Sequence, residues 1–296
     1  MINGILNIKK EAGFTSHDVV AKLRGIVKQK KIGHTGTLDP DAIGVLPVCL
    51  GKATKLCDLL TDKDKTYEAV ILLGTVTDTQ DTSGTILSTS DVKVTSEEVT
   101  QAVMSFVGES EQIPPMYSAL KVNGKKLYEL AREGKVIERK ARPITIHDIS
   151  ILSMELEQNR LRIRVSCSKG TYIRTLCHDI GEKLGCGACM EHLTRTKVSI
   201  FTLEESHTLN EINEYVQNGT LSKVLIPIDH MFMQFPSIVV EEEQMKLLSN
   251  GNRITFTTLT DVKEGSIYRV YDSGGEFAAL YEKTHGGEWK PYKMFR

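Results

Sequence analysis

One glycine-rich loop of this sequence holds two carboxylates in a stiff setting suited to chemistry. Residues 31–51 read KIGHTGTLDPDAIGVLPVCLG. Pro40 fixes its own φ and restricts Asp39 to extended backbone geometry, and the surrounding glycines allow a substrate to approach the backbone closely. Such a loop can hold one carboxylate in a single pose, as covalent catalysis by aspartate requires. The structural alternative is an Asp–Pro turn in which the aspartate only caps the backbone.

The same stretch does not fit a phosphate-binding P-loop. That motif needs four residues between its glycines and Ser or Thr after its lysine, whereas six residues separate Gly44 from Gly51 and Ala53 follows Lys52. A nucleotide enzyme of the P-loop class is therefore not expected.

Metal-ligand patterns are equally weak. Asp78 and Asp81 in DTQDTSG fail the spacing of a calcium loop. Cys186-Gly-Ala-Cys189 is a lone pair with no second pair at matching spacing, so structural cysteines are favoured over zinc. We expect no metal site.

The composition is that of a globular protein of one large domain or two unequal ones. The chain has 296 residues, 40% of them hydrophobic and 25% charged. It begins without a secretory signal pattern, and no apolar run reaches the roughly 18 residues of a membrane helix. We therefore expect a cytoplasmic protein that does not associate with a membrane.

Charge is nearly balanced overall but is segregated along the chain. Residues 121–142 carry eight basic and three acidic residues, whereas residues 204–243 carry eight acidic residues and one basic residue. A further basic block runs from Arg160 to Arg174 without an acid. Such segregation is compatible with a surface for a polyanion, and equally with solvated helices and strands.

The elements that must position these residues follow from hydrophobic periodicity and capping signals. We expect helices at about residues 15–28, 95–106 and from 171 onward, strands at 66–74 and 161–167, a protruding insertion at 113–146, and a β-hairpin within 266–283. Arg174 lies in the first turn of its helix, off the apolar stripe and against the dipole preference. A specific partner is expected to hold it there.

Four blocks of the sequence together closely resemble the TruB family of tRNA pseudouridine synthases. They are GHTGTLDPDAIGVLPVCLGKATKL, DKTYEAVILLGTVTDTQDTSG, IPPMYSALKVNGKKLYELAREGK, and SKGTYIRTLCHDIGEKLG with HLTRTKVSIF after it. They stand in the family's order and cover most of residues 1–230. This resemblance is far more specific than any single short motif.

The resemblance implies roles for individual residues. Asp39 matches the catalytic nucleophile, and Arg174 matches the arginine that pairs with it. Tyr67 matches the tyrosine that stacks on the target base, and His34 matches the histidine that helps to occupy the space left by the flipped-out nucleotide. Whether the carboxylate attacks the sugar or the pyrimidine ring stays open.

Other matching positions concern substrate binding. Tyr172 and Leu193 match residues that line the pocket, although both are also explained by packing. The basic insertion matches the family's RNA-gripping thumb, with Lys121, Lys125 and Lys126 as candidate RNA contacts.

The resemblance also implies the fold and the function. The fold class is α+β, with a mixed, largely antiparallel sheet flanked by helices in a catalytic domain at 1–236 and a small β-rich, PUA-like domain at 237–296. The expected activity is isomerisation of uridine-55 in the T loop of tRNA, with the T stem-loop as partner, no cofactor and no obligatory protein partner, in a monomer. The alternatives are a non-catalytic tRNA-binding or folding protein and a guide-RNA-dependent synthase subunit.

Overall fold

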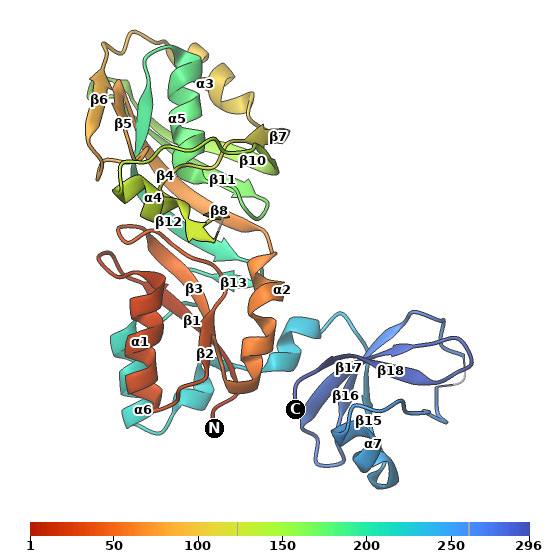
Figure 1. The fold of residues 1–296 in the computed structure, drawn as a ribbon. Helices are drawn as coiled ribbons and strands as arrows, with labels where there is room; N and C mark the ends of the chain where they lie inside the picture. The colour runs from red at the N-terminus through yellow and green to blue at the C-terminus, as the bar shows by residue number, and fades with distance from the viewer. Residues whose placement is uncertain (123, 260) are drawn as a thin grey trace.

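The computed structural model describes residues 1–122, 124–259 and 261–296, and one long mixed sheet dominates it (Figure 1). The strands follow the order β14-β1-β3-β12-β4-β11-β10-β7, with β2 and β13 paired at the side to β3 and β12. In chain order their bounds are β1 Gly4–Lys10, β2 Ile32–His34, β3 Ile43–Leu50, β4 Lys65–Leu73, β7 Gly108–Gln112, β10 Arg142–Glu155, β11 Arg160–Cys167, β12 Ala188–Val198, β13 Phe201–Thr202 and β14 Leu225–Ile226.

Two halves of this sheet meet where β12 runs parallel to β3. Thr194 and Arg195 pair there with Ile43 and Gly44, and the other ladders described in this sheet are antiparallel. The mixed, largely antiparallel sheet flanked by helices predicted from the sequence is confirmed.

Helices cover each half separately (Figure 1). Helix α1 (Ser16–Val27) and helix α6 (Leu209–Gln217) pack on β1 and β3, whereas α3 (Ser96–Met104) and α5 (Ile173–Leu184) pack on the half that contains β4 and β11. The predicted helix starts are confirmed by capping boxes at Thr15 and Thr95. Helix α2 (Cys57–Thr61) lies on the other face of β1 and β3.

The strand predicted at 161–167 has the expected alternation. The four apolar side chains of β11 enter the core shared with α5, and the arginines between them face outward. The positive charge of that outward face is reduced, because Glu68 of the neighbouring β4 pairs with both Arg162 and Arg164, and Arg160 pairs with Glu191 of β12. Two acids, one on β4 and one on β12, therefore offset part of the charge of these three arginines.

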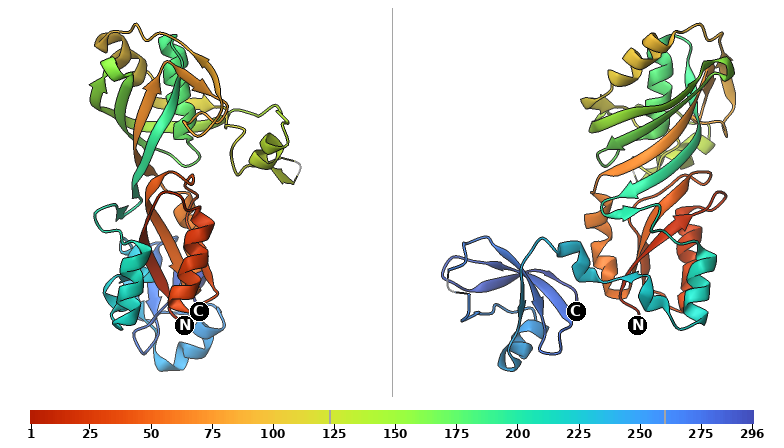
Figure 2. Two further views of the ribbon diagram at one scale, coloured as in Figure 1. Left: turned by 90° about the vertical axis from the view of Figure 1, so that its left-hand side faces the viewer. Right: turned by 180° about the vertical axis from the view of Figure 1, so that it is seen from behind.

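Most of the predicted insertion lies between β7 and β10 and extends away from the sheet in Figure 2, but its last residues, 142–146, belong to β10 and pair with β7. It contains the short hairpin β8 (Lys121–Val122) and β9 (Lys125–Lys126), followed by α4 (Leu127–Arg132). A separate hairpin of β5 (Thr75–Thr77) and β6 (Ile86–Thr89) follows β4.

The C-terminal residues form a small sheet in the order β15-β16-β17-β18 (Figure 2). Its strands are β15 Ser237–Val239, β16 Ile267–Tyr271, β17 Phe277–Lys283 and β18 Trp289–Met294, and α7 (Met245–Ser249) packs beside them. The predicted hairpin is β16–β17. Leu280 and Phe295 pack into the core that also contains Val45 and Phe232, so the two sheets share apolar contacts.

No helix within the described residues combines the length and the apolar character needed to cross a membrane.

Candidate active site

Asp39 and Arg174, which are 135 positions apart in the chain, meet side by side. The Arg174 Nε lies 2.9 Å from Asp39 Oδ2, and its Nη2 donates to Asp39 Oδ1 at 3.2 Å. This is the two-pronged geometry in which a guanidinium binds a carboxylate most strongly. The Arg174 side chain is only 6% exposed, whereas that of Asp39 is 37% exposed. The pair therefore presents a carboxylate to solvent with a buried cation behind it.

Arg174 is buried because several elements supply acceptors for its fixed set of donors. Its Nη1 donates to the Thr79 carbonyl at 3.0 Å and its Nη2 donates to the Tyr117 carbonyl at 2.8 Å. Asp81 Oδ2 lies 3.7 Å from its Nε. These contacts explain the arginine in the first turn of α5, because partners outside the helix outweigh the unfavourable dipole.

The loop that carries Asp39 is held by buried side chains from β1 and α1. Lys10 Nζ donates to the carbonyls of Pro40 at 2.7 Å and Ala42 at 2.6 Å, and Ser16 Oγ accepts from the Leu38 N–H at 2.9 Å. Burial lowers the pKa of Lys10 to about 8. Backbone groups on both sides of Asp39 are therefore fixed: the Leu38 N–H before it and two carbonyls after it.

His34 ends β2 just before this loop, and its ring packs edge-to-face on His17 with centroids 5.3 Å apart. The Gly36 N–H donates to His34 Nδ1 at 3.3 Å, which places the proton of the neutral ring on Nε2. Burial lowers the pKa of His34 to about 4. The ring is therefore uncharged at neutral pH.

Tyr67 and Leu193 lie on β4 and β12 and share one core with Leu38, the residue before Asp39. Burial raises the pKa of the Tyr67 phenol. Tyr172 precedes α5, and its backbone N–H donates to Gln112 Oε1 at 2.8 Å, while Gln112 Nε2 donates to the Tyr172 carbonyl at 3.1 Å. Burial also raises the pKa of Tyr172.

The structure does not bring the three lysines of the insertion to this cluster. Lys121 and Lys125 are exposed on the short hairpin, and Lys126 Nζ donates to the Tyr128 hydroxyl at 3.2 Å. The root of the insertion does reach the cluster, because the Tyr117 carbonyl accepts from Arg174.

Sequence reasoning missed three charged residues of this site. Asp81 stands in a loop whose spacing only excludes a calcium site, and no motif singles out Lys10. Arg195 lies two positions after Leu193 on β12, so the period of two in a strand assigns both to the same face. This alternation could have identified Arg195, although arginine is so rarely buried that composition argues against placing it on a buried face.

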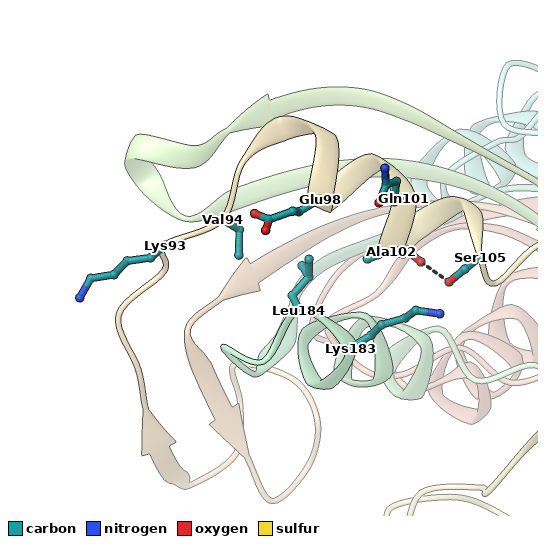
Figure 3. A pocket seen from close by; sticks show the side chains of 8 residues that line it. All are labelled: Lys93, Val94, Glu98, Gln101, Ala102, Ser105, Lys183 and Leu184. Carbon is teal, nitrogen blue, oxygen red and sulfur yellow. Dashed lines mark hydrogen bonds between the residues drawn. The ribbon is translucent and has the colours of Figure 1, made fainter.

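The described residues contain no group of three or more His, Cys, Asp and Glu side chains placed to hold a metal ion, and the six cysteines are free thiols. A surface hollow of about 440 Å³ lies between α3 and the end of α5 (Figure 3). Its lining residues, among them Lys93, Glu98 and Lys183, are distinct from those around Asp39. The chemistry of the Asp39 cluster, and not the size of a hollow, therefore identifies the candidate site.

Comparison with known proteins places this geometry in a family. Residues 24–173 match the model of the TruB family pseudouridylate synthase N-terminal domain, and residues 174–233 match the tRNA pseudouridylate synthase B C-terminal domain. The tRNA pseudouridine synthase B of Lachnoclostridium phytofermentans is 57% identical, over 99% of this chain and 100% of that protein, and the protein of the same name from Clostridium novyi is 50% identical, over 97% of both chains.

Solved structures agree with this assignment at lower identity. A chain in an H/ACA ribonucleoprotein bound to a substrate RNA containing 2′-deoxyuridine is 25% identical with a TM-score of 0.71, covering 99% of this chain and 85% of that one. A chain in a Cbf5–Nop10–Gar1 complex is 27% identical with a TM-score of 0.72, with the same coverage. The chain described here belongs to the TruB family of pseudouridylate synthases.

Proposed function

We propose that this chain is a tRNA pseudouridine synthase that isomerises uridine-55 in the T loop. The observation that carries the proposal is the two-pronged contact between Asp39 and Arg174, in a chain that is 57% identical to a tRNA pseudouridine synthase B. The reaction breaks the bond from N1 of the base to C1′, turns the base, and joins C5 to C1′. The proton that leaves C5 is balanced by a proton gained at N1, so no cofactor is consumed.

A uridine in a folded tRNA loop must first leave its stack, which costs a few kcal/mol. We propose that His34 fills the vacated space with its neutral ring and that Tyr67 stacks on the extruded base. Stacking of a base on an aromatic ring is worth about 1–3 kcal/mol. Tyr172 and Leu193 would complete the pocket walls beside it.

Asp39 then acts as an ionised carboxylate, whether it attacks the sugar or the pyrimidine ring. The adjacent Arg174 guanidinium donates to both oxygens of this carboxylate. Because Arg174 is held by Thr79, Tyr117 and Asp81 as well, it presents its donors to Asp39 in a fixed orientation.

For the rest of the chain, we propose a catalytic domain at 1–236 and an RNA-binding, PUA-like domain at 237–296. The separate core around Val240, Val270 and Trp289 supports this division. We also propose that the chain works on tRNA in the cytoplasm, as a monomer without an obligatory protein partner. The guide-dependent alternative is weaker, because identity to two proteins named tRNA pseudouridine synthase B is 50–57% and to the chains from H/ACA and Cbf5 complexes 25–27%.

The direct test is incubation of the purified chain with an unmodified tRNA transcript and no additive, followed by mapping of pseudouridine. We expect product at the T-loop uridine, and none in a transcript with cytidine at that position. Product that appears only after guide RNA or protein partners are added would support the guided alternative instead. Binding of the transcript without any product would support a tRNA-binding or folding protein.

If the insertion is an RNA-binding thumb, replacing its exposed lysines by glutamate should make tRNA binding weaker and less dependent on salt. For Lys121→Glu with Lys125→Glu, we expect the affinity for tRNA to fall at least tenfold and the slope of log affinity against log salt to decrease by roughly 1–2, because counterion release is lost at two phosphates. Filter binding at several salt concentrations measures both.

Lys93→Glu is the matched control, because Lys93 is exposed and pairs with Asp91 away from the insertion. It should leave affinity and slope close to wild type. An unchanged affinity in the double variant would reject the thumb as an RNA contact.

A further inference from the structure

Arg195 on β12 is a fully buried arginine for which the reaction as described has no use. Its side chain is 1% exposed, and within the described part of the chain no carboxylate forms an ion pair with it. Taking a charged group out of water without a partner is strongly unfavourable, and burial lowers the pKa of this guanidinium. A residue retained under that penalty needs compensating contacts.

Three backbone carbonyls supply those contacts, and they lie on both sides of Asp39 in the chain. Arg195 Nε donates to the Val45 carbonyl at 2.7 Å, its Nη2 to Gly36 at 3.1 Å, and its Nη1 to Thr37 at 3.4 Å. The rigid fork of a guanidinium matches such a divergent set of acceptors. One side chain therefore ties together the entry and the exit of the Asp39 loop.

The backbone of Arg195 fixes the same loop from a second direction. Arg195 pairs with Gly44 where β12 and β3 run parallel. Gly44 has a φ of +112°, and a Cβ added there would lie 2.2 Å from the Arg195 carbonyl oxygen. Only glycine permits this approach, so the loop end and Arg195 are locked together.

Tyr67 is the direct cross-strand partner of Arg195 in the antiparallel ladder of β4 and β12. Such partners share one face of the sheet with their Cβ atoms about 5 Å apart. Burial raises the pKa of the Tyr67 phenol, and the interaction with Arg195 opposes that rise. Because arginine has donors only, it leaves the Tyr67 hydroxyl hydrogen free to point elsewhere.

We propose that Arg195 is a positioning residue that sets the Asp39 loop and the Tyr67 ring at one fixed separation and orientation. The carboxylate and the ring must meet the same extruded uracil, yet they stand on different elements, β4 and the loop before β3. Arg195 is bonded to the loop on both sides of Asp39 and stands opposite Tyr67. The inference rests on the proposed function, because it concerns the two groups that would contact the base.

Single-turnover kinetics with excess enzyme test this role. The amplitude of product reports the folded, binding-competent fraction, whereas the rate constant reports the geometry of each competent site. A misplacement of about 1 Å at a reacting group costs on the order of 100-fold in rate. For Arg195→Gln we expect a rate constant lowered about 100-fold, with amplitude and tRNA dissociation constant within about threefold of wild type.

Arg195→Lys should give an intermediate rate constant, because an ammonium keeps the charge and three donors but not the fork. When Arg195→Lys is combined with Tyr67→Phe, the loss in rate constant should be smaller than the product of the two single losses, since the two residues act together. The matched control is Arg164→Gln on the adjacent β11, where the side chain is 52% exposed and pairs with Glu68. It should react at the wild-type rate.

Three results would overturn the assignment. A normal rate constant with a reduced amplitude would make Arg195 purely structural, as would complete loss of folded protein in both variants. Additivity with Tyr67→Phe would remove the link to the ring. A wild-type chain that gives no product on tRNA would instead refute the proposed function itself, so the two failures are distinguishable.

Discussion

Asp39→Asn should abolish isomerisation while leaving tRNA binding in place. The amide has the shape of the carboxylate, but it has neither the negative charge nor the nucleophilicity that either route of attack requires. We expect product formation to fall at least about 10³-fold, which corresponds to about 4 kcal/mol of lost transition-state stabilisation. The measurement is pseudouridine formed under single-turnover conditions, together with the tRNA dissociation constant.

The fold should tolerate this change, because Arg174 keeps its carbonyl partners and Asp81 nearby. Asp41→Asn is the matched control, since Asp41 lies two residues along the same loop and is exposed. It should retain most of the wild-type rate. Substantial product from the Asp39→Asn variant would remove Asp39 from the chemistry.

Replacement of Arg174 should reduce turnover far more than it reduces tRNA affinity. Arg174 bonds to Asp39, Thr79 and Tyr117 at once, in a plane that lysine cannot reproduce from a single nitrogen. We expect Arg174→Lys to lower the single-turnover rate at least about 100-fold and Arg174→Ala to lower it further. The alanine variant also leaves carbonyl and carboxylate groups without their donor, so it should melt at a lower temperature.

The lysine variant separates the loss of rate from the loss of stability, because it keeps a positive charge beside Asp39. Lys183→Gln on the same helix is the control, since Lys183 is exposed near the other end of α5. If Arg174→Lys lowers only the folded fraction of the protein, and the molecules that do fold react at the wild-type rate, the role of Arg174 is structural and not catalytic.

The C-terminal part contains one feature set by neighbouring residues and one set by residues far apart in the chain. The hairpin β16–β17 follows from two alternating runs around Ser-Gly-Gly, and that prediction is confirmed. The shared core of Leu280 and Phe295 with Val45 was not predicted. Nothing in the period of a strand says which distant surface its second face will meet.

The sequence by itself determined the features that depend on neighbouring residues. Capping boxes start α1 and α3, alternation divides β11 into an apolar and a polar face, and Pro40 restricts the backbone at Asp39. The ordered motifs also identify the family. The helix starts, the alternation and the restriction at Pro40 were predictable because each follows from residues close together in the chain, whereas the side chains that hold the Asp39 loop in place come from distant elements.

Only the tertiary structure decided which charges meet. Strand order places Glu68 beside Arg162 and Arg164, so part of the charge of this basic run is offset. The same order sets Arg195 opposite Tyr67 and behind the Asp39 loop. Ion pairing and burial depend on distance in space, and distance in space is fixed by strand order and register, which no local pattern of residues encodes.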